Sequence, residues 1–202
     1  MGQSKAQEAM GFAGRRRMFT AHEAARHGIH SQVLTRLVRR GAIERVGRGQ
    51  YRFSHGPISE HQTLAVVARA VPDGVVCLLS ALSLHGIGTE LPAQVWLAIP
   101  RGARPPTKVH YPPLRVVKFS GKAFTEGIET RRIAGQPVRV YGVAKTLADL
   151  FKYRNKIGLG VALEALREAW RERRFGMDDM DRYARICRVE RVMTPYLEAL
   201  VA

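Results

Sequence analysis

A segment near the N-terminus carries side chains suited to hydrogen bonding with another molecule. Between residues 31 and 40, the apolar residues recur at i, i+3 and i+4, which predicts the buried stripe of a helix; they are Leu34, Leu37 and Val38. The opposite face then carries Ser31, Gln32, Thr35, Arg36 and Arg39. Short polar groups near a helix N-terminus can read base edges in the major groove, and arginines further along can bind phosphate oxygens. We interpret this helix as a DNA-reading surface; the alternative is an ordinary solvated face.

A second cationic feature follows the helix. Arg48 stands between Gly47 and Gly49, and Arg45 and Arg52 flank this turn. A small cationic tip can enter a narrow minor groove, where the negative potential is strongest, while the flanking arginines reach phosphates. The alternative is a charged hairpin that protects a sheet edge from aggregation.

The elements around these residues follow the order of a winged helix-turn-helix. Thr20 and Glu23 have the spacing of a capping box and predict a helix from residue 21 to 27, which Gly28 ends. After the second helix, Gly41 predicts a left-handed cap, and residues 42–46 and 50–53 predict a β-hairpin. Helix, tight turn, helix and hairpin in this order predict a DNA-binding domain over residues 1–56. The basic run Arg15 to Arg17 is either an arm on the DNA backbone or an unstructured segment.

The charge balance favours a polyanionic partner. The chain has 33 Lys and Arg against 17 Asp and Glu, a formal net charge of +16. The excess lies in residues 1–58 and 101–145, so we expect two basic surfaces. The alternatives are a general abundance of arginine without a binding role, or an RNA partner; duplex RNA has a major groove too narrow for the predicted helix.

The remaining residues, 60–202, predict a mixed α/β domain, so the fold class is α/β of the α+β type. We expect a helix over 60–71, a strand over 75–79 and a short helix over 81–85 capped by Ser80. Strands follow at 95–99 and 114–119, and a hairpin at 128–133 and 138–141 with its turn at Gly135-Gln136. From residue 143 the period changes to 3.6, which predicts C-terminal helices, among them 177–189 and 194–201.

Catalytic and metal motifs are weak in this sequence. Asp178, Asp179 and Asp181 resemble a metal cluster, but they fall at a predicted helix start, where acids stabilise the helix dipole. The segment from Gly142 to Thr146 lacks the glycines of a phosphate-binding loop. We therefore expect no catalytic residue, metal or cofactor, and a protein that is not an enzyme. The alternative is a nuclease-like enzyme with a DNA-binding head, although Glu126 and Glu129 are the only acids near the second basic block.

Targeting signals and disulfide patterns are also weak. No run of eighteen apolar residues is present, and the N-terminus lacks the features of a signal peptide. The two cysteines, Cys77 and Cys187, have no metal-ligand spacing. We expect a cytoplasmic protein with two free thiols and no membrane partner.

Taken in order, several segments resemble the AbiEi-type antitoxins, a family of transcriptional regulators. The N-terminal residues that carry the resemblance are Phe19-Thr20, Gly28-Ile29, Leu34 to Gly41 and Arg45 to Tyr51. Ser80 to Gly86, Gly135 to Val140 and Lys145 to Phe151 extend it over roughly residues 18–175. The resemblance implies repression of the protein's own operon by binding double-stranded DNA, and counteraction of a cognate nucleotidyltransferase-like toxin. In the shared segment around Thr146, Asp149 is expected to have a structural role, pairing with Lys145 or Lys152 or capping a helix.

Overall fold

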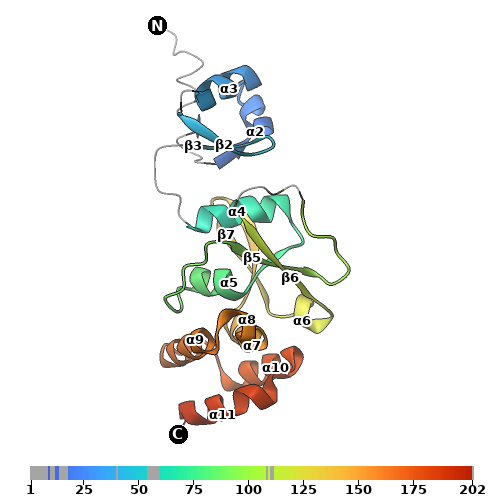
Figure 1. The fold of residues 1–202 in the computed structure, drawn as a ribbon, viewed down its shortest axis with the longest axis vertical. Helices are drawn as coiled ribbons and strands as arrows, with labels where there is room; N and C mark the ends of the chain where they lie inside the picture. The colour runs from blue at the N-terminus through green and yellow to red at the C-terminus, as the bar shows by residue number, and fades with distance from the viewer. Residues whose placement is uncertain are drawn as a thin grey trace.

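The computed structural model of the chain describes residues 9, 12–13, 18–39, 41–53, 60–107, 109 and 112–201 (Figure 1). Its hydrophobic side chains gather in one cluster formed by residues 9–51 and in two clusters formed by residues 64–197. The mixed α/β fold class is confirmed. The expected boundary at residues 56–60 falls largely outside the described residues, as do Arg15 to Arg17. Within the described part of the chain, no helix is long and apolar enough to cross a membrane.

The N-terminal unit is a pair of helices on a small antiparallel sheet. Its elements are β1 (Met18–Thr20), α2 (Ala21–Arg26), α3 (Ser31–Arg39), β2 (Ile43–Gly47) and β3 (Gln50–Phe53). The strands are ordered β1-β3-β2, which confirms the hairpin and adds a strand that was not predicted. A three-residue strand is too short to show the alternation by which strands are recognised.

A capping box begins α2, and a glycine turn leads from α2 to α3. The Thr20 hydroxyl accepts a hydrogen bond from the Glu23 amide at 3.1 Å, and the Glu23 carboxylate accepts one from the Thr20 amide at 2.8 Å. The predicted capping box is therefore confirmed. Gly28 has φ +72°, a left-handed conformation that suits the turn into α3. Ile29, in the same turn, is buried in the core of the unit beside Leu34 and Leu37.

The second sheet has five strands in the order β6-β5-β4-β8-β7. They are β4 (Val75–Val76), β5 (Val95–Pro100), β6 (Leu114–Phe119), β7 (Ile128–Ile133) and β8 (Gln136–Tyr141). β5 pairs with β6 and β4 with β8 in parallel, whereas β4–β5 and β7–β8 are antiparallel. β6 and β7 are thus the two edges of a mixed sheet.

Helices cover both faces of this sheet (Figure 1). α4 (Glu60–Ala70) packs on one face, where its Leu64 and Val67 join Val138 and Val140 of β8 in a buried cluster. The other face packs against the C-terminal helices through Trp96, Phe119 and Tyr141. The remaining helices are α5 (Leu78–His85), α6 (Lys122–Thr125), α7 (Val143–Lys152), α8 (Arg154–Ile157), α9 (Leu159–Arg171), α10 (Met177–Cys187) and α11 (Glu190–Val201).

Three expectations in this unit were wrong in detail. The strand predicted over 75–79 ends at Val76, and α5 already begins at Leu78, with Cys77 as its N-cap. An apolar run of this length does not distinguish a buried strand from a buried helix start. Ser80 is therefore not the cap: it lies inside α5, and its hydroxyl accepts the Trp96 amide at 3.0 Å.

Two smaller differences concern element ends. The β7–β8 turn is Ala134-Gly135, both with positive φ, one residue earlier than expected. Type I′ hairpin turns need this conformation at both central residues. α11 begins at Glu190 rather than Thr194, so Pro195 lies inside the helix, in its second turn.

Candidate nucleic-acid interface

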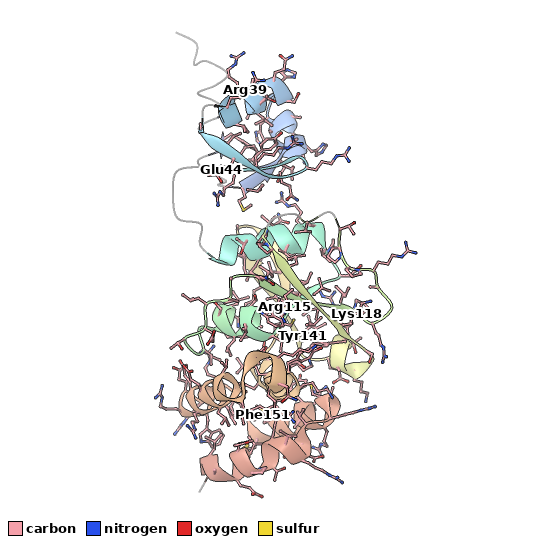
Figure 2. The ribbon with its side chains drawn as sticks, viewed as in Figure 1. Arg39, Glu44, Arg115, Lys118, Tyr141 and Phe151 are labelled. Carbon is pink, nitrogen blue, oxygen red and sulfur yellow. The ribbon has the colours of Figure 1, made fainter. Side chains whose placement is uncertain are left out.

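The exposed face of α3 carries the five side chains that the sequence placed there. Ser31, Gln32, Thr35, Arg36 and Arg39 are all exposed, whereas Leu34 and Leu37 are 1% and 3% exposed. Val38 is half-buried against the same core. Figure 2 shows Arg39 at the end of the N-terminal unit that lies farthest from the second sheet. The polar face of α3 therefore lies open to a partner.

The polar groups of α3 differ in which hydrogen-bond donors and acceptors remain available to a partner. The Thr35 hydroxyl donates to the Ser31 carbonyl at 3.1 Å, so its proton is used inside the helix. Its oxygen can still accept a hydrogen bond, and its methyl group can contact a thymine methyl. Gln32 presents both a donor and an acceptor, the pair that matches an adenine edge. The first turn of α3 has no acidic residue, and its last turn holds Arg36 and Arg39.

The hairpin places a cation at its tip. Arg48 and Gly49 form the two-residue turn between β2 and β3, and Arg48 is exposed. Gly49 has φ +71°, which L side chains rarely adopt. Arg45 is also exposed, and its side chain donates to the Gly47 carbonyl at 3.4 Å across a register shift in the strand pairing. Arg45 thus lies at the base of the turn that presents Arg48.

Arg52 occupies a different face from the other predicted DNA contacts. Its register partners are Met18 on β1 and Glu44 on β2, whereas the neighbouring Tyr51 is buried against the α2–α3 core. Because side chains alternate along a strand, Arg52 lies on the sheet face turned away from α3. Its guanidinium is ion-paired with Glu44.

Glu23 combines two roles at the start of α2. Burial by itself would raise its pKa, but hydrogen bonds from the amide and hydroxyl of Thr20 and the nearby Arg69 lower the pKa overall. Its carboxylate also accepts a hydrogen bond from Arg69 of α4 at 2.6 Å, a contact between the N-terminal unit and the second one. Sequence patterns did not indicate Arg69, since no local pattern reveals a partner 46 residues away.

The second unit contains a deeply buried ion pair inside α7. The Lys145 ammonium lies 2.6 Å from the Asp149 carboxylate, and both side chains are at most 3% exposed. The Cys187 thiol of α10 donates to the other carboxylate oxygen at 3.2 Å. Lys145 also lies 4.1 Å from the ring centroid of Tyr141. The expected pairing of Asp149 with Lys145 is confirmed, and the cluster joins α7 to α10.

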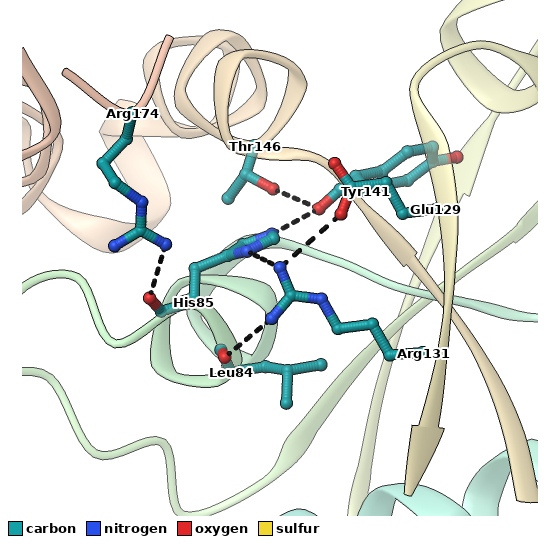
Figure 3. A network of polar contacts seen from close by, with 7 residues as sticks. All are labelled: Leu84, His85, Glu129, Arg131, Tyr141, Thr146 and Arg174. Carbon is teal, nitrogen blue, oxygen red and sulfur yellow. Dashed lines mark hydrogen bonds and ion pairs between the residues drawn. The ribbon is translucent and has the colours of Figure 1, made fainter.

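His85 lies in a second polar network, at the end of α5 (Figure 3). Its Nε2 is 2.7 Å from the Tyr141 carbonyl, which can only accept, so this nitrogen carries the proton. Arg131 donates to Nδ1 at 2.8 Å. Burial lowers the pKa of His85, and the Arg131 guanidinium lowers it further. Both ring nitrogens are occupied in a neutral imidazole, an arrangement that fixes α5 against β7 and β8.

Four of the acidic residues considered for catalysis lie at a helix start or in ion pairs. Asp178 and Asp179 lie in the first turn of α10, as their dipole role predicts. Glu126 is ion-paired with Arg182, and Glu129 lies 3.5 Å from Arg131. Within the described ranges, no group of three or more His, Cys, Asp or Glu side chains is arranged to hold a metal ion.

Comparison with known proteins agrees with the N-terminal geometry. Residues 10–54 match the family described as "Transcriptional regulator, AbiEi antitoxin". No curated protein matches the chain. A solved structure, the RV2827C protein from Mycobacterium tuberculosis, superposes with a TM-score of 0.63 over 91% of this chain and 72% of that one, at 13% identity. That likeness shows a shared fold. The resemblance to the AbiEi antitoxin family of transcriptional regulators is thus confirmed for residues 10–54, the segment that contains α3 and the β2–β3 hairpin.

Proposed function

We propose that this protein binds operator DNA through α3 and the β2–β3 turn, represses its own operon and counteracts a nucleotidyltransferase-like toxin. The observation that carries the DNA-binding part is the exposed face of α3. It combines hydrogen-bonding groups at the N-terminal end with two arginines further along, and α3 itself contains no acidic residue. The match of residues 10–54 to a regulator family supports it.

In this proposal α3 enters the major groove, where Ser31, Gln32 and Thr35 face base edges. Arg36 and Arg39 bind phosphate oxygens on the flanking backbone. Arg48 reaches the adjacent minor groove, with Arg45 at the base of the same turn. Arg52 is left outside this surface, because it is paired with Glu44 on the opposite face of the sheet.

The proposed activity requires binding and no covalent step, and no cofactor enters it. The competing function is a nuclease-like enzyme guided by its DNA-binding head. Against it, the two acids near the second basic block, Glu126 and Glu129, are both engaged in ion pairs. Incubating pure protein with plasmid and magnesium tests this directly, and reproducible cutting would favour the enzyme.

The test of DNA binding is a gel shift of the full chain on the duplex upstream of its own gene. Unrelated duplex of equal length and duplex RNA of the same sequence are run alongside, at low and physiological salt. We expect the upstream duplex to be preferred and to remain bound at physiological salt. Equal, salt-sensitive binding to every duplex would mean that net charge alone acts, and would contradict a sequence-specific repressor.

Toxin counteraction needs a separate test in cells. Co-expression of the chain with the adjacent gene should restore growth that the adjacent gene alone inhibits. A variant with Arg36→Ala and Arg48→Ala, expressed from an unrelated promoter, separates repression from any action on the toxin itself. Growth rescue by this variant would place the counteracting activity outside the DNA-binding face.

A further inference from the structure

Seven cations of the second basic block, residues 101–145, fall into two groups in the structure. Arg131, Arg139 and Lys145 are used internally: Arg131 binds His85, Arg139 donates to the Asp73 carbonyl at 3.0 Å, and Lys145 pairs with Asp149. A second group lies on or beside β6 and is exposed to solvent. Its members are Arg101, Arg115, Lys118 and Lys122. Among the described residues, no acidic side chain forms an ion pair with any of these four.

β6 is also an edge strand with an open row of backbone groups. Among the strands that the structure describes, it pairs with β5 alone, and the Val95 and Arg101 amides donate to the Pro113 and Phe119 carbonyls at 2.9 and 2.8 Å. In a parallel ladder, alternate residues direct their amide and carbonyl toward the partner strand. The odd-numbered residues of β6 therefore face β5, and the backbone groups of Leu114, Val116 and Lys118 point outward.

The exposed cations lie on both faces of this edge. Arg115 is in register with Trp96, lies 4.7 Å over its ring and shares the face that packs on the C-terminal helices. Lys118 is in register with Ile99, which belongs to the cluster beneath α4. Figure 2 shows both side chains on the strand that ends next to α6. Ala103, near the start of the connection from β5 to β6, packs with the α4-side cluster.

We propose that β6 is a docking edge for an extended, acidic segment of a partner protein, which adds to the sheet as a sixth strand. The open backbone row provides the hydrogen bonds of strand addition, and Arg115 and Lys118 select acidic side chains on the two faces of the added strand. Duplex DNA fits this site less well, because rigid phosphates cannot flank both faces of one sheet edge. This inference goes beyond the proposed DNA-binding function and does not depend on α3.

Charged side chains on an edge strand can also serve only to prevent aggregation. The experiment must therefore distinguish this protective role from the binding of a partner segment. The probe is a fluorescently labelled peptide of glutamate and threonine, with glutamates at both odd and even positions. Its controls are the same peptide with alternate backbone nitrogens methylated and a version with lysine in place of glutamate. We expect the acidic peptide to bind the full chain, and both controls to bind roughly tenfold more weakly or not at all.

Two further measurements locate the binding. Hydrogen exchange of the Val116 and Lys118 amides should slow when the acidic peptide is bound, whereas the Val117 amide, which faces β5, should not change. Lys118→Glu and Arg115→Glu should each weaken binding of the acidic peptide by roughly tenfold. The matched control, Arg132→Glu on β7, should leave peptide binding unchanged. Circular dichroism checks that each variant is folded.

Any of three results would overturn the proposal. Equal binding of the methylated peptide would show that charge alone is responsible, and unchanged exchange at Val116 and Lys118 would place the peptide elsewhere. Loss of upstream-duplex binding in Lys118→Glu, together with no peptide binding, would assign this edge to nucleic acid. The gel shift of Arg36→Ala tests the DNA-binding face independently, so the two proposals can fail separately.

Discussion

At the scale of single residues, the proposed DNA-binding face makes different predictions for its members. Gln32→Ala should weaken operator binding by about 1–3 kcal/mol and relax the preference at one base pair, since Gln32 is placed to read a base edge. Arg48→Ala should weaken binding to all duplexes similarly and reduce the slope of log affinity against log salt concentration by about 1. The exposed Arg167 of α9 is the control, because Arg167→Ala removes the same charge far from α3. Gel shifts across a salt series measure both effects, and a Gln32→Ala protein with unchanged base preference would refute the reading role.

His85 gives a second prediction at this scale. Burial holds its pKa below the usual range, so the folded protein favours the neutral ring. The unfolded chain, with an ordinary histidine pKa of about 6.5, then binds more protons as the solution is acidified. The stabilisation is complete above that pH and is lost as the pH falls through about 6.5 toward the lowered value. Urea unfolding between pH 5 and 8 should show this loss, and His85→Gln, which keeps one donor and one acceptor, should reduce it. An identical pH dependence in both proteins would exclude the assigned protonation state.

At the scale of elements, the N-cap of α2 provides a test of how much local capping stabilises the N-terminal unit. Thr20→Ala removes the side-chain acceptor of the capping box and should destabilise the N-terminal unit by about 1 kcal/mol. Faster hydrogen exchange across α2 and α3 is the readout. Thr194 provides a matched control: its hydroxyl donates to the Glu190 carbonyl within α11, so Thr194→Ala leaves every cap intact. Equal exchange in the wild type and Thr20→Ala would mean that tertiary packing alone holds α2.

The buried ion pair of α7 predicts an asymmetric response. Lys145→Met leaves Asp149 buried without its countercharge, and we expect a loss of about 3–5 kcal/mol in the free energy of unfolding. Replacing both partners, as Lys145→Met with Asp149→Leu, should recover most of that loss, because no unpaired charge remains. Urea unfolding followed by tryptophan fluorescence measures both variants. A double variant as unstable as the single one would show that the pair itself, and not charge burial, stabilises the α7–α10 contact.

At the scale of the whole molecule, the two units should unfold separately. The Glu23–Arg69 ion pair between them is part-exposed, and such pairs contribute about 0–1 kcal/mol. Both tryptophans, Trp96 and Trp170, lie in the second unit, so their fluorescence reports that unit alone. Thr20→Ala and Arg69→Ala should therefore leave the fluorescence-detected urea midpoint nearly unchanged. A clear shift of that midpoint with Thr20→Ala would mean that the units fold as one cooperative body, against the predicted boundary at residues 56–60.

The N-terminal unit was predictable from sequence because its signals are local. The stripe of Leu34, Leu37 and Val38, the Thr20–Glu23 cap and the glycine turns act within a few residues, so they determine α2, α3 and the hairpin before any long-range contact forms. The short apolar run at residues 75–79 shows the limit of such signals: a buried strand and a buried helix start look alike. Only packing of Cys77 and Leu78 beneath the C-terminal helices decided where α5 begins.

The sequence by itself determined how many cations the protein has, and the tertiary structure decided which of them stay available. In the sequence, Arg45 and Arg52 were equivalent flanks of one turn, with Arg48 at its tip. Strand register then paired Arg52 with Glu44 and left Arg48 exposed at the tip. In the same way, contacts between residues distant in sequence engaged Arg131 with His85 and placed the buried Lys145 over the Phe119 ring, whereas Arg115 and Lys118 stayed exposed on the edge strand. Charge is a property of composition, whereas its use depends on partners that only the folded chain brings within hydrogen-bonding distance.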